Sequence, residues 1–214
     1  MNRLFTSMMV LGCSLGFVAC NDDDEGKIPP SGILTTEEMY GDYDGKMLTL
    51  TPRSLANEED GDSPLQGVDV VAKVANDTIY FDNLPIKDLV LSIVGDEGLA
   101  DQIVEAVGEV DYCIGYKPAL NETRDSILFT LDPKPLKLSV NLPSDAAEGE
   151  PAEPLAIEVK VSPAPGAGYE AKSTRMSFRF RADEVLLGEG EEQAPLPTFT
   201  PTTFDFDLSK SAKK

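Results

Sequence analysis

Hydrophobic and polar residues alternate along most of the chain from residue 46 to residue 208. A period of two is typical of strands that have one buried and one solvated face. Clean alternation also favours antiparallel strands, because strands of parallel sheets are buried on both faces. Clusters rich in Asp, Asn, Gly and Pro separate the alternating segments and form turns. The pattern therefore predicts about nine strands, within residues 46–51, 68–74, 79–81, 110–116, 127–131, 136–142, 155–161, 176–180 and 204–208.

One segment, residues 85–108, breaks this period, because its apolar residues recur at helical spacing. Pro85 suits the first turn of a helix and Gly95 its end. Asp96 can cap a second helix, which Gly108 ends. Two short amphipathic helices are therefore predicted, packed on the sheet or across the mouth of a barrel. Their apolar faces carry Ile86, Leu89, Val90, Ile93 and Val94 in the first, and Leu99, Ile103, Ala106 and Val107 in the second.

These elements predict one mainly antiparallel β domain over residues 37–209, with the short helical pair inserted between strands. A calycin-like curled barrel and a β-sandwich are both compatible with the pattern. Three acidic segments rich in Gly, Pro and Ala, at 55–64, 143–154 and 188–197, are expected to be mobile loops. Residues 210–214 form a basic C-terminal tail.

The first residues have the pattern of a secretory leader: Arg3, an apolar run over 4–19, then Cys20. The run is shorter than the ~20 apolar residues of a membrane-spanning helix. Residues 17–20 resemble the lipobox of bacterial lipoproteins, which implies a signal peptide at 1–19 and lipidation of Cys20. Cleavage elsewhere would leave Cys20 as a free thiol.

Residues 20–36 are predicted to be a flexible acidic and proline-rich tether. The acidic run at 21–25 resembles the export signal of Bacteroidetes surface lipoproteins, and a solvated spacer is the alternative. Together with an acylated Cys20, the resemblance implies an outer-membrane protein that is anchored by lipid and faces the exterior.

The composition of the chain limits the classes of activity and binding that it can have. The 214 residues hold 38 Asp and Glu against 18 Lys and Arg, a formal charge of −20. So acidic a chain is not expected to bind nucleic acid, whose phosphates its own field would repel. It has no His, which excludes Ser-His-Asp and Cys-His catalysis and most transition-metal sites. A hydrolase that uses a pair of carboxylates remains as an alternative, but the acids cluster in loops and on solvated strand faces, where no burial would raise a pKa. We therefore expect no enzyme activity, no cofactor and no metal site. A calcium loop at 57–62 is disfavoured, because it lacks the ligand spacing of an EF-hand.

The remaining cysteine, Cys113, is expected to be a small core residue, since Cys13 leaves with the leader and Cys20 is taken by lipid. Tyr40, Tyr43 and Tyr80 are the aromatic platforms available to a carbohydrate, in a chain without Trp.

Two groups of side chains are candidates for ligand binding. Arg175, Arg179 and Arg181 form a row on one face of a strand and suit a carboxylate or phosphate group. Cross-strand pairing with Asp205, Asp207 or Glu158 is the favoured alternative. The second group would line an apolar cavity below the helices and comprises Leu89, Ile103, Tyr112 and Tyr116, although core packing is favoured for the two tyrosines.

Two short patterns, Asp77-Thr78-Ile79 and Asp125-Ser126-Ile127, fit the O-glycosylation motif of Bacteroidetes. Modification at either site would indicate export and not activity.

Several segments in a fixed order resemble a family of Bacteroidetes lipoproteins whose domain has no assigned function. They lie at 40–47, 79–86, 93–97, 110–117 and 133–136. A Gly-x-Tyr-x-Gly pattern at 41–45 also resembles the start of lipocalin-like barrels. The resemblance implies the fold and the location, and it carries no catalytic residues.

We therefore expect a monomeric, surface-exposed lipoprotein that acts as a non-enzymatic binding module, for a small apolar ligand in a barrel cavity. The alternative is a structural or adhesive envelope component that binds a protein or a glycan. The sequence does not separate them, because an apolar face has the same pattern whether it lines a cavity or fills a core.

Overall fold

The computed structural model describes residues 33–51, 67–140 and 154–212. The predicted signal peptide, Cys20, most of the tether, the loop at 55–64 and nearly all of the loop at 143–154 lie outside these residues. So does the candidate calcium loop at 57–62. No helix in the described part of the chain is long and apolar enough to cross a membrane.

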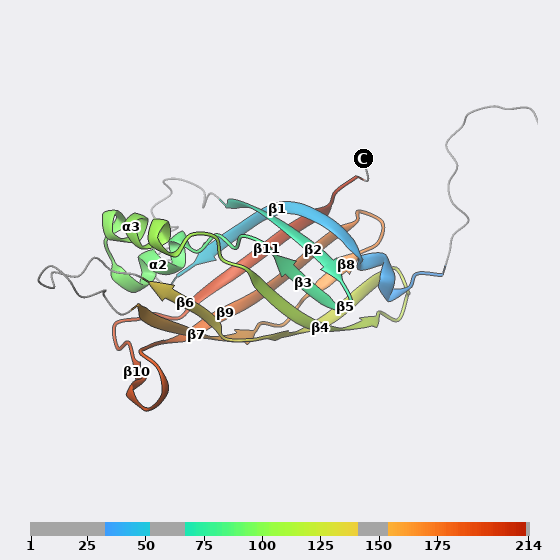
Figure 1. Ribbon diagram of the computed structural model, residues 1–214. Coiled ribbons are helices and arrows are strands. Elements are labelled where there is room, and N and C mark those ends of the chain that lie inside the picture. The colour runs from blue at the N-terminus through green and yellow to red at the C-terminus, as the bar shows by residue number, and fades with distance from the viewer. Residues whose placement is uncertain (1–32, 52–66, 141–153, 213–214) are drawn as a thin grey trace, which may run out of the picture. The chain divides into compact units, whose positions relative to one another are not determined.

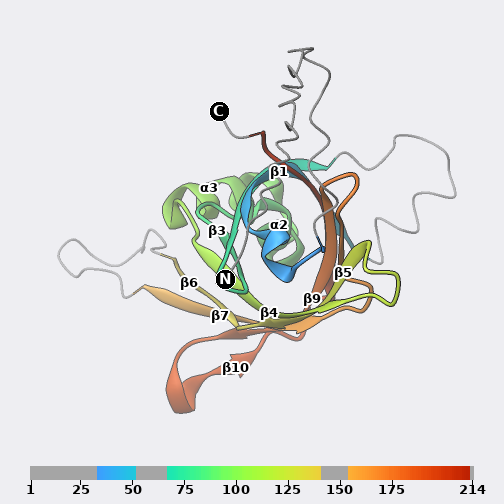
Figure 2. The same ribbon diagram turned by 90° about the vertical axis from the view of Figure 1, so that its right-hand side faces the viewer.

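Eight antiparallel strands form a closed barrel, which is one of the two architectures predicted (Figure 1). Their order is β11-β1-β2-β3-β4-β5-β8-β9, and pairing of β9 with β11 closes the ring (Figure 2). The strands are β1 (Gly41–Leu50), β2 (Val68–Ala75), β3 (Thr78–Phe81), β4 (Tyr112–Leu120), β5 (Ser126–Pro133), β8 (Gly168–Glu170), β9 (Arg175–Leu187) and β11 (Thr202–Lys210).

The sheet extends beyond the barrel along the second half of β9. Here β9 pairs with β7 (Leu155–Pro163), which pairs in turn with β6 (Leu136–Val140). The segment at 188–197, predicted to be a mobile loop, instead contains the 3-10 helix η3 (Gly190–Glu192) and the short strand β10 (Ala194–Pro195). That prediction is wrong because β10 adds to the free edge of β9, opposite residues 186 and 187.

The two predicted helices are present, and three of their four ends follow the expected signals. Pro85, expected in the first turn of the first helix, lies before its N-cap, Ile86. Helix α2 (Lys87–Val94) ends at Gly95, whose φ of 71° is the left-handed conformation that glycine adopts readily. Helix α3 (Glu97–Val107) begins after Asp96, whose side chain accepts a hydrogen bond of 2.8 Å from the Leu99 N–H. Gly108 follows its last turn.

The buried face of α3 differs from the predicted one. Ala100 and Ile103 are buried, whereas Leu99 and Ala106, both expected on the apolar face, are exposed. The helix is therefore rotated relative to the predicted face, so that Ala100 and Ile103 face the core.

The two ends of the barrel carry different elements. Helices α2 and α3 lie side by side at one end, and the 3-10 helix η1 (Thr36–Met39) lies at the other (Figure 1). In the view along the barrel, η1 lies within the outline of the ring (Figure 2). Met39, its last residue, is fully buried.

The first strand begins at Gly41, five residues before the predicted start, and alternates normally from there. β1 and β11 approach each other closely at Gly45, since a Cβ there would be 2.1 Å from the Asp207 carbonyl oxygen. The β2–β3 hairpin turns through Asn76 and Asp77, which both have positive φ, at 51° and 53°. Two-residue turns of this kind match the twist of the flanking strands.

Candidate functional site

The interior of the barrel is filled by aromatic side chains. Phe178 and Phe206 stack with centroids 4.7 Å apart, and Phe180 packs on Phe206 at 5.3 Å. Phe81, Phe129 and Phe204 join the same cluster. Pairs at these separations are favourable beyond their buried area. The inward face of the alternating strands is therefore a packed core.

In the described part of the chain, no cavity of ligand size lies below α2, where the sequence predicted an apolar ligand site. Below α2, the space between the helix and the sheet measures about 10 Å³ and is lined by residues that include Leu89, Tyr112 and Phe204. Ligand pockets typically measure ~300–1,000 Å³, and 10 Å³ is about the volume that a single water needs. Leu89 and Ile103, the two predicted ligand contacts on the helices, are both buried in the core.

Four tyrosines are buried in the core, and the hydroxyls of three of them, Tyr43, Tyr112 and Tyr116, differ in partners. The Tyr112 hydroxyl donates to the Lys134 carbonyl at 2.7 Å, and the Tyr43 hydroxyl donates to the Met39 carbonyl at 2.7 Å. The Tyr116 hydroxyl has no hydrogen-bond partner among the described residues. Burial raises the pKa of all three hydroxyls. They remain neutral and serve packing in this conformation.

Two of the three predicted carbohydrate platforms are not available as flat exposed surfaces. Tyr43 is fully buried. Tyr40 is half-buried, and its hydroxyl donates to Asp77 Oδ1 at 3.0 Å, which raises the pKa of Tyr40. Only Tyr80 presents its ring outward, with 37% of its surface exposed.

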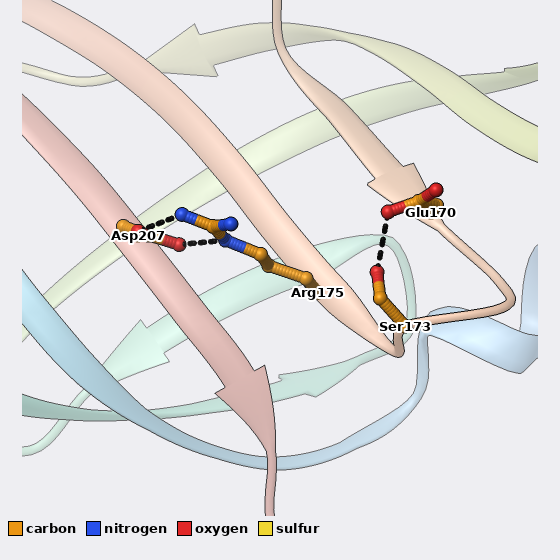
Figure 3. A network of polar contacts seen from close by, with 4 residues as sticks. All are labelled: Glu170, Ser173, Arg175 and Asp207. Carbon is orange, nitrogen blue, oxygen red and sulfur yellow. Dashed lines mark hydrogen bonds and ion pairs between the residues drawn. The ribbon is translucent and has the colours of Figure 1, made fainter.

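The predicted arginine row lies on the outer face of β9, and each of its members forms an ion pair. Arg175 binds Asp207 of β11 through two nitrogens (Figure 3). Arg179 lies opposite Asp205, with Nε 3.6 Å from the carboxylate. These two pairs are the cross-strand alternative that the sequence favoured. Arg181 instead binds Asp183 of its own strand at 2.5 Å.

These pairs continue around the barrel as a belt of alternating charge. Lys46 of β1 binds Asp69 of β2 at 2.7 Å and lies in register with Asp207 of β11. The hydrogen bond to Asp207 raises the pKa of Arg175, whereas partial burial raises the pKa of Asp205. Exposed pairs of this kind contribute about 0–1 kcal/mol each. The belt orders neighbouring strands, and it already occupies the guanidinium groups that an anion would need.

The two glycosylation patterns lie at hairpin turns. The Thr78 hydroxyl donates to the Asn76 carbonyl at 3.3 Å, and the Ser126 hydroxyl donates to Asp125 Oδ1 at 3.1 Å. Hydrogen bonds to Asp125, chiefly from Asn121, lower the pKa of that carboxyl. Both hydroxyl-bearing residues are half-buried at the start of a strand.

The structure reveals a surface feature that the sequence pattern did not predict, where β2 separates from β3. The two strands pair only from Lys73 to Ala75, opposite Tyr80 to Thr78. The chain then leaves β2, because residues 82–83 bend and the Leu84 N–H donates to the Val110 carbonyl beside β4. Residues 68–72 of β2 therefore have a strand partner on the β1 side and none on the β3 side in the described part of the chain.

A groove of about 570 Å³ follows this open edge. Its apolar surface comes from Val71, which is 68% exposed, and from Tyr80. Its polar rim carries three carboxylates and one lysine: Asp42, Asp69, Asp82 and Lys73. We name this surface, lined by Asp42, Asp69–Lys73, Tyr80, Asp82 and Asn83, the β2-edge groove.

Cys113 lies near this groove and corrects a prediction. It is exposed on the outer face of β4, opposite Tyr80 of β3. The expected core position is wrong because Tyr112 and Ile114, its neighbours, point inward.

Among the described residues, no group of three or more His, Cys, Asp or Glu side chains is placed to hold a metal ion.

Comparison with known proteins gives one match. A family model described as "Domain of unknown function (DUF4840)" matches residues 38–187. No curated protein and no solved structure matches the chain.

Proposed function

Since the chain belongs to the DUF4840 family, whose domain has no assigned function, we propose that it is a non-enzymatic binding module that engages a protein partner through its outer surface. The module is anchored by lipid on Cys20 to the outer membrane and faces the cell exterior. The sequence left two functions open, binding of a small apolar ligand and binding of a protein or glycan partner, and the proposal is the second.

The filled barrel is the observation that carries this proposal. A carrier needs an interior volume for its ligand, and the space below α2 measures about 10 Å³. The surface grooves are far larger, at about 570 Å³ along β2 and about 500 Å³ beside β6 and β7. A macromolecule can use such open grooves, because it buries additional surface around them.

Extraction of the protein in a mild detergent tests the proposal. Size-exclusion chromatography and native mass spectrometry should find the protein in a complex with a second polypeptide at fixed stoichiometry. Recovery of the protein alone under all mild conditions, or with only a small molecule bound, would contradict partner binding.

A Cys20→Ser variant tests the anchor separately. It should leave the membrane fraction, since two or more acyl chains are needed for stable attachment. A variant that stays in the membrane fraction would contradict lipidation at this position. Protease treatment of whole cells should remove the wild-type domain, and protection from protease would contradict its exterior location.

A further inference from the structure

We infer that the β2-edge groove binds an extended peptide segment of alternating basic and apolar residues, which adds to β2 as a further strand. This inference rests on the proposed function, since it describes the partner by its chemistry. The backbone groups of β2 that have no strand partner among the described residues provide the affinity, and the charge of the groove selects the side chains.

The register of the hairpin determines which backbone groups of β2 point toward the open side. In a two-residue hairpin the residues flanking the turn exchange hydrogen bonds, so that Ala75 and Lys73 direct their N–H and C=O groups toward β3. By the same alternation Val71 and Asp69 direct theirs to the same side. No strand lies there in the described part of the chain. An added strand would pair with these groups, as in peptide recognition at exposed sheet edges.

The two faces of the edge define which side chains an added strand should carry. Outward-facing positions would lie beside Asp69 and Val71, and inward-facing positions beside Val70 and Ala72, which are buried. Side chains of a strand alternate between faces. The outward positions of the partner should therefore be basic and the inward positions small and apolar.

Charge complementarity favours a basic partner. The groove carries Asp42, Asp69 and Asp82 against Lys73, and Asp69 is the one of the three acids for which an ion pair, with Lys46, is found in the described part of the chain. The whole chain has a formal charge of −20. A second copy of this chain would bring like charges to the groove, and like charges that face each other disfavour association. A cationic segment would be attracted.

Fluorescence anisotropy with synthetic peptides tests the inference on the purified protein. The probe is a short labelled peptide of alternating lysine and valine. The controls are a glutamate–valine peptide and a lysine–valine peptide with N-methylated backbone amides, which keeps the charge but cannot form the ladder. The lysine–valine probe should bind at least about tenfold more tightly than its N-methylated form, since hydrogen bonds that contribute about 1 kcal/mol each are lost.

Two substitutions locate the binding. Val71→Lys should weaken binding of the probe at least about tenfold, because it places a cation at the centre of the groove. Leu128→Lys is the matched control. Leu128 is also an exposed apolar strand residue, at 55%, but its strand β5 is paired on both sides. It should change the affinity less than about threefold, since surface changes away from a site are small.

Each other outcome overturns the inference. Equal affinity for the plain and N-methylated peptides would indicate attraction by charge alone. Equal effects of the two lysine substitutions would place the binding elsewhere. A dimer that sedimentation detects and Val71→Lys dissociates would show that a second copy occupies the edge. If the extracted protein retains a polypeptide partner but the lysine–valine peptide does not bind, the result would support the proposed function and contradict this inference.

Discussion

Replacing Phe206 by alanine is expected to destabilise the protein by about 3–5 kcal/mol, the range measured for buried phenylalanine. Phe206 is fully buried at the centre of the barrel. Its ring contacts Phe178 at 4.7 Å and Phe81 and Phe180 at 5.3 Å each. Three favourable ring pairs place the expected loss toward the upper end of that range, because each contributes about 0.5–1.5 kcal/mol beyond burial.

The free energy of unfolding, from urea denaturation, measures this loss. A loss of about 3–5 kcal/mol corresponds to a fall in Tm of roughly 6–20 °C in a domain of this size. Leu128→Ala is the control, since its side chain is mostly exposed, and it should cost less than about 0.5 kcal/mol. Benzene should raise the Tm of the Phe206→Ala variant and not of the wild type, because an apolar cavity of that kind stays dry and binds it.

A loss below about 1 kcal/mol for Phe206→Ala would refute the reasoning, since it would mean that the ring is not tightly packed. Stabilisation of the wild-type protein by benzene would refute it as well, because the barrel would then contain an accessible cavity.

Three further predictions concern single residues. Gly45→Ala should destabilise the protein by about 1–3 kcal/mol or more, because its Cβ would lie 2.1 Å from a carbonyl oxygen of β11. The control, Gly115→Ala, should cost less than about 1 kcal/mol, because the nearest atom to its Cβ is 3.9 Å away. Equal losses of the two variants in urea denaturation would contradict the close approach. Tyr116→Phe should be neutral or stabilising, because it removes a buried hydroxyl without a partner, and Tyr43→Phe should cost about 1 kcal/mol through the lost hydrogen bond; a large loss for Tyr116→Phe would show that its hydroxyl is bonded. Cys113 should react with a thiol reagent in the folded protein at a rate close to that in denaturant, as its exposure implies, and strong protection would contradict the outward orientation.

The parts of the fold that could be predicted from the sequence depend on local signals. Gly95, Asp96 and Gly108 lie at helix ends and act through backbone conformation and capping. Strict alternation similarly marks each strand and its inward face. The same alternation predicts Cys113 on the outer face of its strand, because its neighbours Tyr112 and Ile114 point inward. The usual burial of cysteine, which favoured a core position, was the weaker signal.

The remaining features depend on contacts between distant residues. The open edge of β2 exists because Leu84 bonds to Val110 and draws the chain away from β2. The partners of Arg175 and Arg179 follow from the register between β9 and β11. Whether the barrel is hollow depends on how six phenylalanines meet, and alternation alone does not contain that information.

The most direct test of the account is photocrosslinking on whole cells, with a photoreactive phenylalanine analogue at position 71 or, in a matched variant, at position 128. The account predicts that position 71 crosslinks to a single polypeptide and that position 128 does not. No adduct at position 71, or the same adducts at both positions, would contradict binding at the open edge of β2.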